Sequence, residues 1–200
     1  MMDAFCHAIE SFWSVNSTKE SKEYAKEAIR LIVENKDSYL QADEKGNINM
    51  LHAANLAGKA INITQTTAGH AMCYKITGLY DISHGHAAAL CTAGLWKYMM
   101  EHMEQCVDYR GRDYLWDVFM EVSQAMGCNT VEAAIEYFCK FIVKLGLEIP
   151  VLKDRSELDI LISSVNPVRL KNNPVKLEEK DIKELYLRIL DKNEWRKQKV

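Results

Sequence analysis

The strongest constraint on the fold is the spacing of apolar residues, which follows the period of an α-helix along most of the chain. No segment shows the apolar–polar alternation of a half-buried β-strand. The three prolines all lie beyond residue 149, where they interrupt no expected helix interior. Helices are predicted over 3–13, from the cap at 17–18 to about 40, and over 49–63, 70–76, 84–98, 114–126, 131–145, 157–165 and 178–191. The pattern therefore predicts an all-α fold.

Polar, glycine and small residues indicate how these helices end and pack. Ser17 or Thr18 is expected to cap the second helix, and residues 43–46 (DEKG) are expected to form a turn. Gly127 and Gly146 are expected C-terminal caps, and Ser156 is an expected N-cap. One predicted helix carries a face of small residues that would let another helix approach closely: Ala53, Ala54, Ala57, Gly58 and Ala60.

Length and composition favour one helical domain over residues 1–200. A chain of 200 residues with 48% hydrophobic content can bury a sizeable core, and no low-complexity linker divides it. The formal net charge of −3 and the absence of a basic stripe argue against a nucleic-acid or membrane-surface partner. The six cysteines form no CxxC pair and no apolar signal segment precedes them, which predicts reduced thiols in a cytoplasmic protein.

Three histidines and one aspartate form a candidate metal-binding set. Asp3 and His7 are four residues apart, so a helix places both side chains on one face. His70 and His84 follow in two later segments, fourteen residues apart. Imidazole nitrogens with one carboxylate oxygen suit Fe(II) or Zn(II) and are a poor cage for Ca(II) or Mg(II). The simpler alternatives are a helix cap for Asp3 and ordinary polar roles for the histidines.

The segments around these residues resemble a known enzyme family. Residues 2–10 (MDAFCHAIE), 68–77 (AGHAMCYKIT) and 83–90 (SHGHAAAL) look like the metal-binding half of the iron-containing (group III) alcohol dehydrogenases, which have a dehydroquinate synthase-like fold. Residues 166–174 (NPVRLKNNP) resemble the closing segment of a branch that includes phosphonoacetaldehyde reductase-like members. The resemblance implies a helical C-terminal domain. It also implies that Fe(II), or alternatively Zn(II), is bound by Asp3, His7, His70 and His84.

Two features depart from the family pattern. Many members carry a histidine four residues after the third ligand, where this chain has Tyr74. Members also have an N-terminal α/β domain with a glycine-rich turn for NAD(P), whereas this chain starts just ahead of Asp3 and shows no such turn. The expectation is a C-terminal half whose partner is an N-terminal dinucleotide-binding domain or chain, and which is inactive alone.

Tyr74 and His86 are the candidate catalytic residues. Tyr74 lies one helical turn after His70, so it is expected to face the metal cleft, where it could hydrogen-bond a substrate oxygen; the alternative is a core tyrosine. His86 follows His84 by two residues and could meet the substrate or the nicotinamide ring, or simply cap a helix. His52 is expected at the surface or in a supporting contact, as is His102.

Further polar residues are expected near the same cleft or in the tail. Lys75 and the pair Thr66-Thr67 could contact an anionic substrate group, although a solvated lysine and a helix cap are the simpler interpretations. Arg169 and Lys171 are expected to order the tail against the core.

The predicted activity is metal-assisted hydride transfer between NAD(P) and a small alcohol or aldehyde. The alternatives are a non-catalytic metal-binding or assembly domain derived from such an enzyme, and a plain helical structural domain. The sequence leaves open the substrate, the choice of Fe(II) or Zn(II), the choice of NAD or NADP, and assembly into a homo-oligomer.

Overall fold

The computed structural model describes residues 1–196, and over that range the chain is helical without a β-strand. The all-α prediction is confirmed. The elements, with one short 3-10 turn, are α1 (Met2–Trp13), α2 (Lys19–Leu40), α3 (Glu44–Thr64), α4 (Ala68–Tyr80), α5 (His84–Glu101), η1 (Met103–Gln105), α6 (Arg112–Ala125), α7 (Val131–Lys144), α8 (Arg155–Ser163), α9 (Pro167–Leu170), α10 (Glu179–Ile189) and α11 (Lys192–Arg196).

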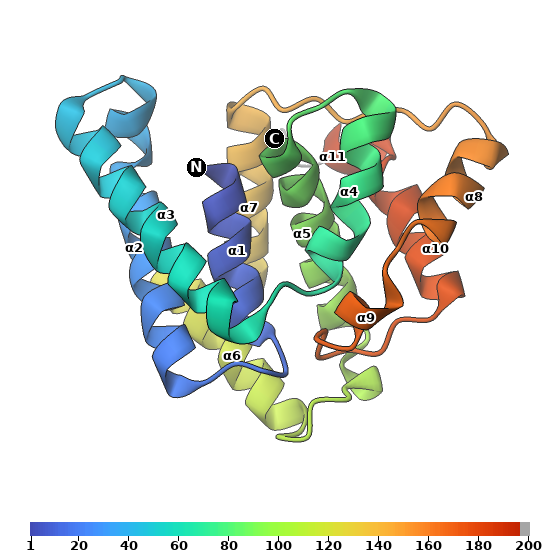
Figure 1. The fold of residues 1–200 in the computed structure, drawn as a ribbon, viewed down its shortest axis with the longest axis horizontal. Coiled ribbons are helices and arrows are strands. Elements are labelled where there is room, and N and C mark those ends of the chain that lie inside the picture. Colours follow the sequence, from blue (N-terminus) through green and yellow to red (C-terminus); the bar gives the residue numbers. More distant parts are fainter. Residues whose placement is uncertain (197–200) are drawn as a thin grey trace.

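Helices α1 and α5 form the centre of the molecule (Figure 1). Helix α1 packs against α2, α3, α5 and α6, while α5 packs against α1, α4, α7 and α10. Phe5 and Trp13 of α1 are fully or almost fully buried, and the Trp13 ring meets the Trp96 ring edge-on with 5.7 Å between centroids. Edge-to-face aromatic pairs of this kind add stability beyond their buried area. The core therefore holds α1, the helix that carries Asp3 and His7, in a fixed place.

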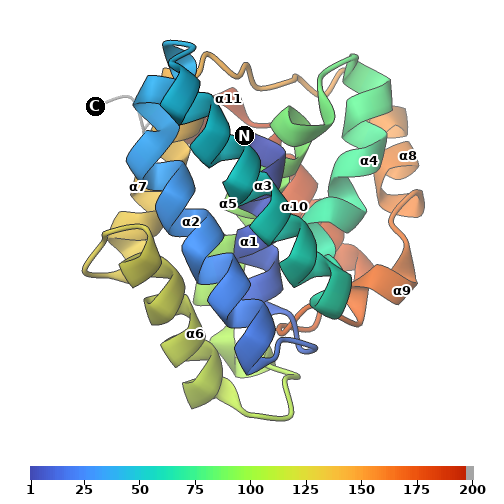
Figure 2. The ribbon, with the colours of Figure 1, turned by 60° about the vertical axis from the view of Figure 1, so that its left-hand side comes forward.

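Helices α2 and α3 form an antiparallel hairpin on one side of α1 (Figure 2). Thr18, one of the two residues expected to cap α2, does so through a reciprocal pair of hydrogen bonds with Ser21. The expected turn at 43–46 is wrong, because Asp43 accepts a hydrogen bond from the Gly46 backbone N–H and so starts α3 at Glu44. Gly46 is required there, since an added Cβ would lie 2.6 Å from the Ser38 carbonyl carbon.

The small-residue face of α3 is only partly used for packing. Ala53, Ala57 and Ala60 are buried, as expected. Ala54 and Gly58 are exposed instead, and an added Cβ at Gly58 would meet nothing within 4 Å. The buried stripe is narrower than predicted because α3 has neighbours on one side only, so residues on its outer face reach solvent.

Helices α4 and α5 bring the second and third histidines to the centre. Helix α4 does not stop near Gly78 but continues to Tyr80, and it ends where Asp81 adopts a left-handed conformation with φ 51°. Ser83 is the N-cap of α5, so His84 is its first residue. His70 lies in the first turn of α4. Both histidines therefore stand at helix starts that are packed against one another.

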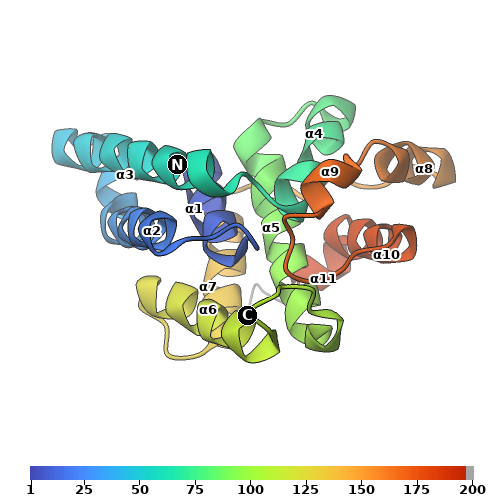
Figure 3. The ribbon, with the colours of Figure 1, turned by 60° about the horizontal axis from the view of Figure 1, so that its bottom comes forward.

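Helices α8, α9 and α10 cover the other side of α4 and α5 (Figure 3). The N-cap of α8 is Asp154, which accepts from Glu157 N, and not Ser156 as expected. The expected caps Gly127 and Gly146 both have positive φ, as a C-terminal cap requires. Among the described residues, none of the helices is long and apolar enough to cross a membrane.

Candidate metal centre

Asp3, His7, His70 and His84 meet at one place, although they come from three helices. Asp3 and His7 share one face of α1, His70 comes from the start of α4, and His84 from the start of α5. Gly85 permits this approach, because a Cβ there would lie 2.9 Å from the Asp3 backbone nitrogen. The structure thus brings together all four residues that the sequence singled out.

The donor atoms of Asp3, His7 and His70 lie within 4.8 Å of one another, and His84 joins them through Asp3. Asp3 Oδ1 lies 3.5 Å from His70 Nε2 and 3.4 Å from His84 Nε2, and Asp3 Oδ2 lies 3.5 Å from His7 Nδ1. The His7 and His70 rings stack with 4.3 Å between centroids. Two donor atoms bound to one cation at about 2.0–2.2 Å lie roughly 3.0–3.5 Å apart. The spacing of these atoms therefore fits a shared transition-metal ion.

Two buried atoms of the cluster have no hydrogen-bond partner. Asp3 Oδ1 and His70 Nε2 are both buried and unsatisfied, although they are within ion-pair distance of each other. Leaving such a group unpaired costs about 1–3 kcal/mol. A cation between them would bind Asp3 Oδ1 and take the place of a proton on His70 Nε2. The residues present therefore fit a divalent transition metal.

A buried carboxylate that was not among the candidate residues contacts the side of the His70 ring opposite Asp3. Glu10 is fully buried, and its Oε1 lies 2.7 Å from His70 Nδ1. Its Oε2 accepts from both the backbone N–H and the hydroxyl of Thr67, each at 2.7 Å. The Thr92 hydroxyl donates to Oε1 at 3.3 Å. Because the Nδ1 proton of His70 is directed to Glu10, Nε2 is the atom left to bind a cation.

One sequence signal indicates Glu10. Glu10 follows Asp3 by seven residues and His7 by three, so a helix places all three on the same face. Its role depends on Thr67, Gly69 and His70, which are about sixty residues away, and a Cβ at Gly69 would lie 2.3 Å from Glu10 Oε1. The face could be predicted from the sequence, but the contact could not.

The charges within the cluster shift the pKa values of its members. Burial, helped by the neighbouring His70, lowers the pKa of His7 to about 4. Burial also lowers the pKa of His70, but the Glu10 and Asp3 carboxylates outweigh it and raise that pKa to about 9. The contact with His70 lowers the pKa of Asp3 against the opposing effect of burial. The centre therefore has ionised carboxylates at neutral pH, and a cation binding to His70 would replace a proton.

Tyr74 lines the open side of the cluster. Its side chain is 50% exposed, which excludes the core alternative, and its ring lies 5.3 Å from the His84 ring. The hydroxyl accepts a hydrogen bond from Arg169 Nη1 at 2.6 Å. Tyr74 therefore lies beside the candidate ligand His84, on the exposed side of the cluster.

His86 is bound to another segment. Its Nε2 lies 2.8 Å from the backbone carbonyl oxygen of Glu148, and because a carbonyl only accepts, Nε2 carries the proton. Burial lowers the pKa of His86, which favours the neutral ring. His86 therefore ties the start of α5 to the segment after α7, and its Nδ1 is the nitrogen left for any further contact.

The remaining candidates occupy different positions. His52 is exposed on α3, and His102 Nδ1 donates to the Tyr98 carbonyl while its ring stacks on the Tyr98 ring at 4.0 Å. Lys75 and Lys171 are exposed. These residues make no contact with Asp3 or the three clustered histidines within the described part of the chain.

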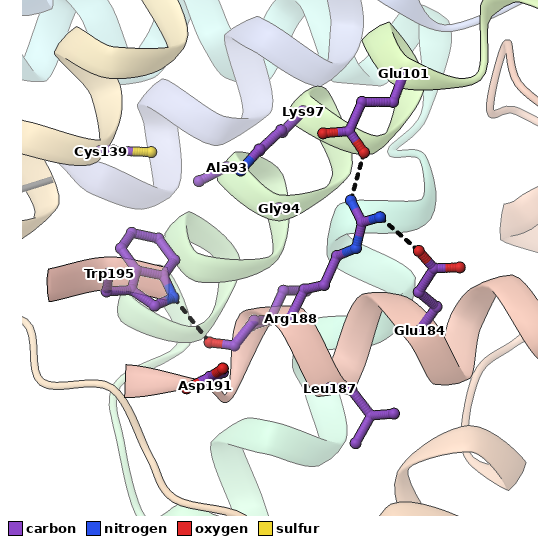
Figure 4. A pocket seen from close by; sticks show the side chains of 11 residues that line it. Ala93, Gly94, Lys97, Glu101, Cys139, Glu184, Leu187, Arg188, Asp191 and Trp195 are labelled. Carbon is purple, nitrogen blue, oxygen red and sulfur yellow. Dashed lines mark hydrogen bonds and ion pairs between the residues drawn. The ribbon is translucent and has the colours of Figure 1, made fainter. Parts of the chain in front are cut away.

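A cavity of about 510 Å³ lies elsewhere, between α5, α10 and α11 (Figure 4). None of the four candidate ligands lines it. Arg188 extends across it to Glu101 and Glu184, and Trp195 Nε1 donates to the Ile189 carbonyl at 2.9 Å. The arginine of this cavity is already paired with carboxylates, and the cavity is distinct from the cluster of candidate metal ligands.

Comparison with known proteins identifies the family. A family model described as the C-terminal part of the Fe-containing alcohol dehydrogenases matches residues 1–190. The chain belongs to the iron-containing alcohol dehydrogenase family. Phosphonoacetaldehyde reductase from Streptomyces viridochromogenes is 27% identical over 187 residues, which cover 91% of this chain and 47% of that protein. The 1,3-propanediol dehydrogenase of Citrobacter freundii is 29% identical over 200 residues, which cover 92% of this chain and 48% of that protein.

Solved structures of the iron-containing alcohol dehydrogenase family have the same fold. The iron-containing alcohol dehydrogenase of Thermotoga maritima superposes with a TM-score of 0.74 and 27% identity, over 94% of this chain and 47% of that one. The resemblance inferred from the sequence is confirmed. The chain spans about half the length of the curated relatives that it matches.

Proposed function

We propose that this chain is the metal-binding half of an NAD(P)-dependent alcohol dehydrogenase or aldehyde reductase, with Asp3, His7, His70 and His84 holding Fe(II) or, alternatively, Zn(II). The observation that supports it most is the pair of buried, unsatisfied atoms Asp3 Oδ1 and His70 Nε2 within this family's fold. When bound, such a cation supplies Lewis-acid chemistry that polarises the oxygen of an alcohol or a carbonyl group.

The chain's own residues prepare this centre. Glu10 holds the Nδ1 proton of His70 and thereby fixes the ring and directs Nε2 toward Asp3. Cys73 Sγ lies 3.7 Å from His84 Nδ1, on the ring edge opposite the atom that faces Asp3. The Tyr74 hydroxyl, half exposed beside His84, is placed to donate a hydrogen bond to a substrate oxygen. His86 holds the start of α5 in place through Glu148.

The second wall of the active site is proposed to come from an N-terminal dinucleotide-binding domain or chain. The matched relatives are about twice as long as the part that aligns here. Hydride transfer requires the nicotinamide to be held against the reacting carbon, and that positioning needs a second surface. The substrate is proposed to be a small alcohol or aldehyde, as the names of both relatives suggest.

Two measurements test this function. Elemental analysis of the purified protein should find close to one divalent transition metal per chain. Oxidation of NADH or NADPH with small aldehydes should then be measured with and without an added dinucleotide-binding domain. Turnover only in the presence of that domain supports the proposal, whereas metal binding without turnover in either case favours a non-catalytic metal-binding role.

A further inference from the structure

Arg169 carries a positive charge next to Tyr74, which neighbours the candidate metal ligand His84. It belongs to the short helix α9, and its guanidinium lies over the Tyr74 ring at 4.8 Å from the centroid. The same Tyr74 ring lies 5.3 Å from the His84 ring. Tyr74 is therefore in contact with a candidate metal ligand on one side and with Arg169 on the other.

The hydrogen bonds of Arg169 use only part of its guanidinium. Nη1 donates to Thr66 Oγ1 at 3.1 Å and to Tyr74 Oη at 2.6 Å. Among the residues and side chains that the structure describes, Nη2 and Nε donate to no protein acceptor. These two nitrogens form the edge that binds phosphonate, sulfonate or carboxylate groups through two parallel hydrogen bonds. The edge of Arg169 best suited to an anion is therefore free.

The absence of a carboxylate partner distinguishes Arg169 from two comparable arginines. Arg110 and Arg188 are also partly buried, and each pairs with an acidic side chain, Arg110 with Asp108 at 2.7 Å and Arg188 with Glu184 at 2.6 Å. Arg169 forms no ion pair with any side chain that the structure describes. A partly buried guanidinium held only by neutral hydroxyls still lacks a counter-charge.

The charge of Arg169 is not needed to attach α9 to the core. Asn172, three residues later, donates from Nδ2 to the Thr66 carbonyl at 3.0 Å, and its own carbonyl accepts from Val15 N at 3.0 Å. Asn16 adds a bond to Asn172 Oδ1 at 3.0 Å. These neutral bonds order the segment together with the bonds from Arg169 to Thr66 and Tyr74. The bonds of Arg169 agree with the expectation for that residue, whereas Lys171 is exposed.

We propose that Arg169, with Tyr74 and Thr66, forms a subsite for the anionic end of the substrate, a phosphonate, sulfonate or carboxylate group a few bonds from the aldehyde carbon. This inference rests on the proposed function. The hydroxyls of Tyr74 and Thr66 accept from Nη1, so their own hydrogens can donate to the same anion. A substrate held by the metal centre at one end and by Arg169 at the other is fixed in orientation.

The kinetic test uses the protein together with the proposed dinucleotide-binding domain, either on the same polypeptide or added as a separate chain. NAD(P)H oxidation is measured with phosphonoacetaldehyde, with the carboxylate analogue malonic semialdehyde, and with neutral propionaldehyde. In Arg169→Met, the ratio of kcat/KM for each anionic aldehyde to that for propionaldehyde should fall roughly 30- to 100-fold. Arg169→Lys keeps the charge but loses the planar guanidinium that makes two parallel hydrogen bonds. Its kcat/KM ratio should fall less than that of Arg169→Met. Lys171→Gln, an exposed cation two residues away, is the matched control and should leave the ratio unchanged.

A binding measurement provides a readout independent of turnover. Methylphosphonate is titrated into the protein without added metal while the side-chain Nε–H resonances of its arginines are followed by NMR. One resonance, absent in Arg169→Met, should shift and saturate, while those of Arg110 and Arg188 should not move. Thermal melting of each variant checks that the fold is retained.

The outcomes separate the subsite from the proposed function. Turnover with an unchanged substrate ratio in Arg169→Met overturns the subsite and leaves the proposed function standing, and so does a rise in the KM for NAD(P)H alone. Absence of turnover with all three aldehydes contradicts the proposed function, and the methylphosphonate titration then decides the anion subsite by itself. If the phosphonate and carboxylate aldehydes differ in their dependence on Arg169, the larger effect identifies the natural anionic group.

Discussion

Glu10 and His70 are in contact at 2.7 Å in a buried position, and this contact ties α1 to α4 beside the other candidate metal ligands. The carboxylate takes two further hydrogen bonds from Thr67, so its own position is fixed from both oxygens. Because the ring of His70 cannot turn without breaking this bond, the direction of its Nε2 is set by Glu10.

The first prediction concerns this contact. Glu10→Gln keeps the size of the side chain but removes its charge, so His70 becomes a weaker and less fixed ligand. The affinity for Fe(II) or Zn(II) should fall about 10- to 100-fold. Competitive chelator titration measures the change, with thermal melting of the metal-free protein as the check on folding. An unchanged affinity in a folded variant would show that Glu10 serves packing alone.

The second prediction concerns the ligands themselves. His70→Ala and His84→Ala should each lower the metal affinity sharply and reduce the metal content after gel filtration, because each removes one imidazole ligand. His52→Ala, an exposed histidine on another helix, is the control and should retain full metal content. Elemental analysis after gel filtration gives the answer, and full metal content in both site variants would refute the proposed ligand set.

The longer helices could be predicted from the sequence because each depends on its own periodicity, whereas the short helices α9 and α11 were not predicted. The helix ends were harder to predict, because a glycine does not by itself end a helix. Gly46 lies inside α3 because Asp43 caps that helix, and Gly78 lies inside α4, which ends only at Asp81. Local side-chain and backbone geometry outweighed the glycine preference at both places.

The candidate ligands could be named from spacing and from family resemblance, but their surroundings could not. Glu10 reaches His70 across sixty positions, and Arg169 reaches Tyr74 across ninety-five. Contacts at such separations depend on how α1, α4 and α9 pack, and no local pattern encodes that. The roles of Glu10 and Arg169 therefore became apparent only in three dimensions.

The third prediction uses two glycines as a matched pair. Gly85→Ala places a Cβ 2.9 Å from the Asp3 backbone nitrogen, so α1 and α5 must separate at the metal centre. The variant should be destabilised by about 1–3 kcal/mol and should bind metal more weakly. Gly58→Ala has nothing within 4 Å of the new Cβ and should stabilise the exposed helix by roughly 0.5–1 kcal/mol. Denaturant melts and metal titration of both variants provide the comparison. Equal effects at the two positions would mean that the close approach at Gly85 does not matter.

The last prediction concerns activity of the 200-residue chain by itself. Hydride transfer needs the nicotinamide held against the reacting carbon, and a cofactor that meets only one wall keeps its freedom of motion. No glycine-rich strand–turn–helix for the pyrophosphate occurs in the sequence, and within residues 1–196 the structure has no strand that could supply one. The metal-loaded chain should therefore show no appreciable oxidation of short alcohols or reduction of short aldehydes with NAD or NADP.

A steady-state assay of the chain with a panel that includes 1,3-propanediol, propionaldehyde and phosphonoacetaldehyde measures this. Metal content and thermal melting are determined on the same sample, so that inactivity reflects the missing wall and not an unfolded or metal-free protein. Addition of a dinucleotide-binding domain from a relative is the positive arm, because it supplies the absent surface. Turnover on the order of one per second or faster by the chain alone would mean that these helices contain a cofactor site of their own. The proposal that a separate dinucleotide-binding domain completes the active site would then be wrong.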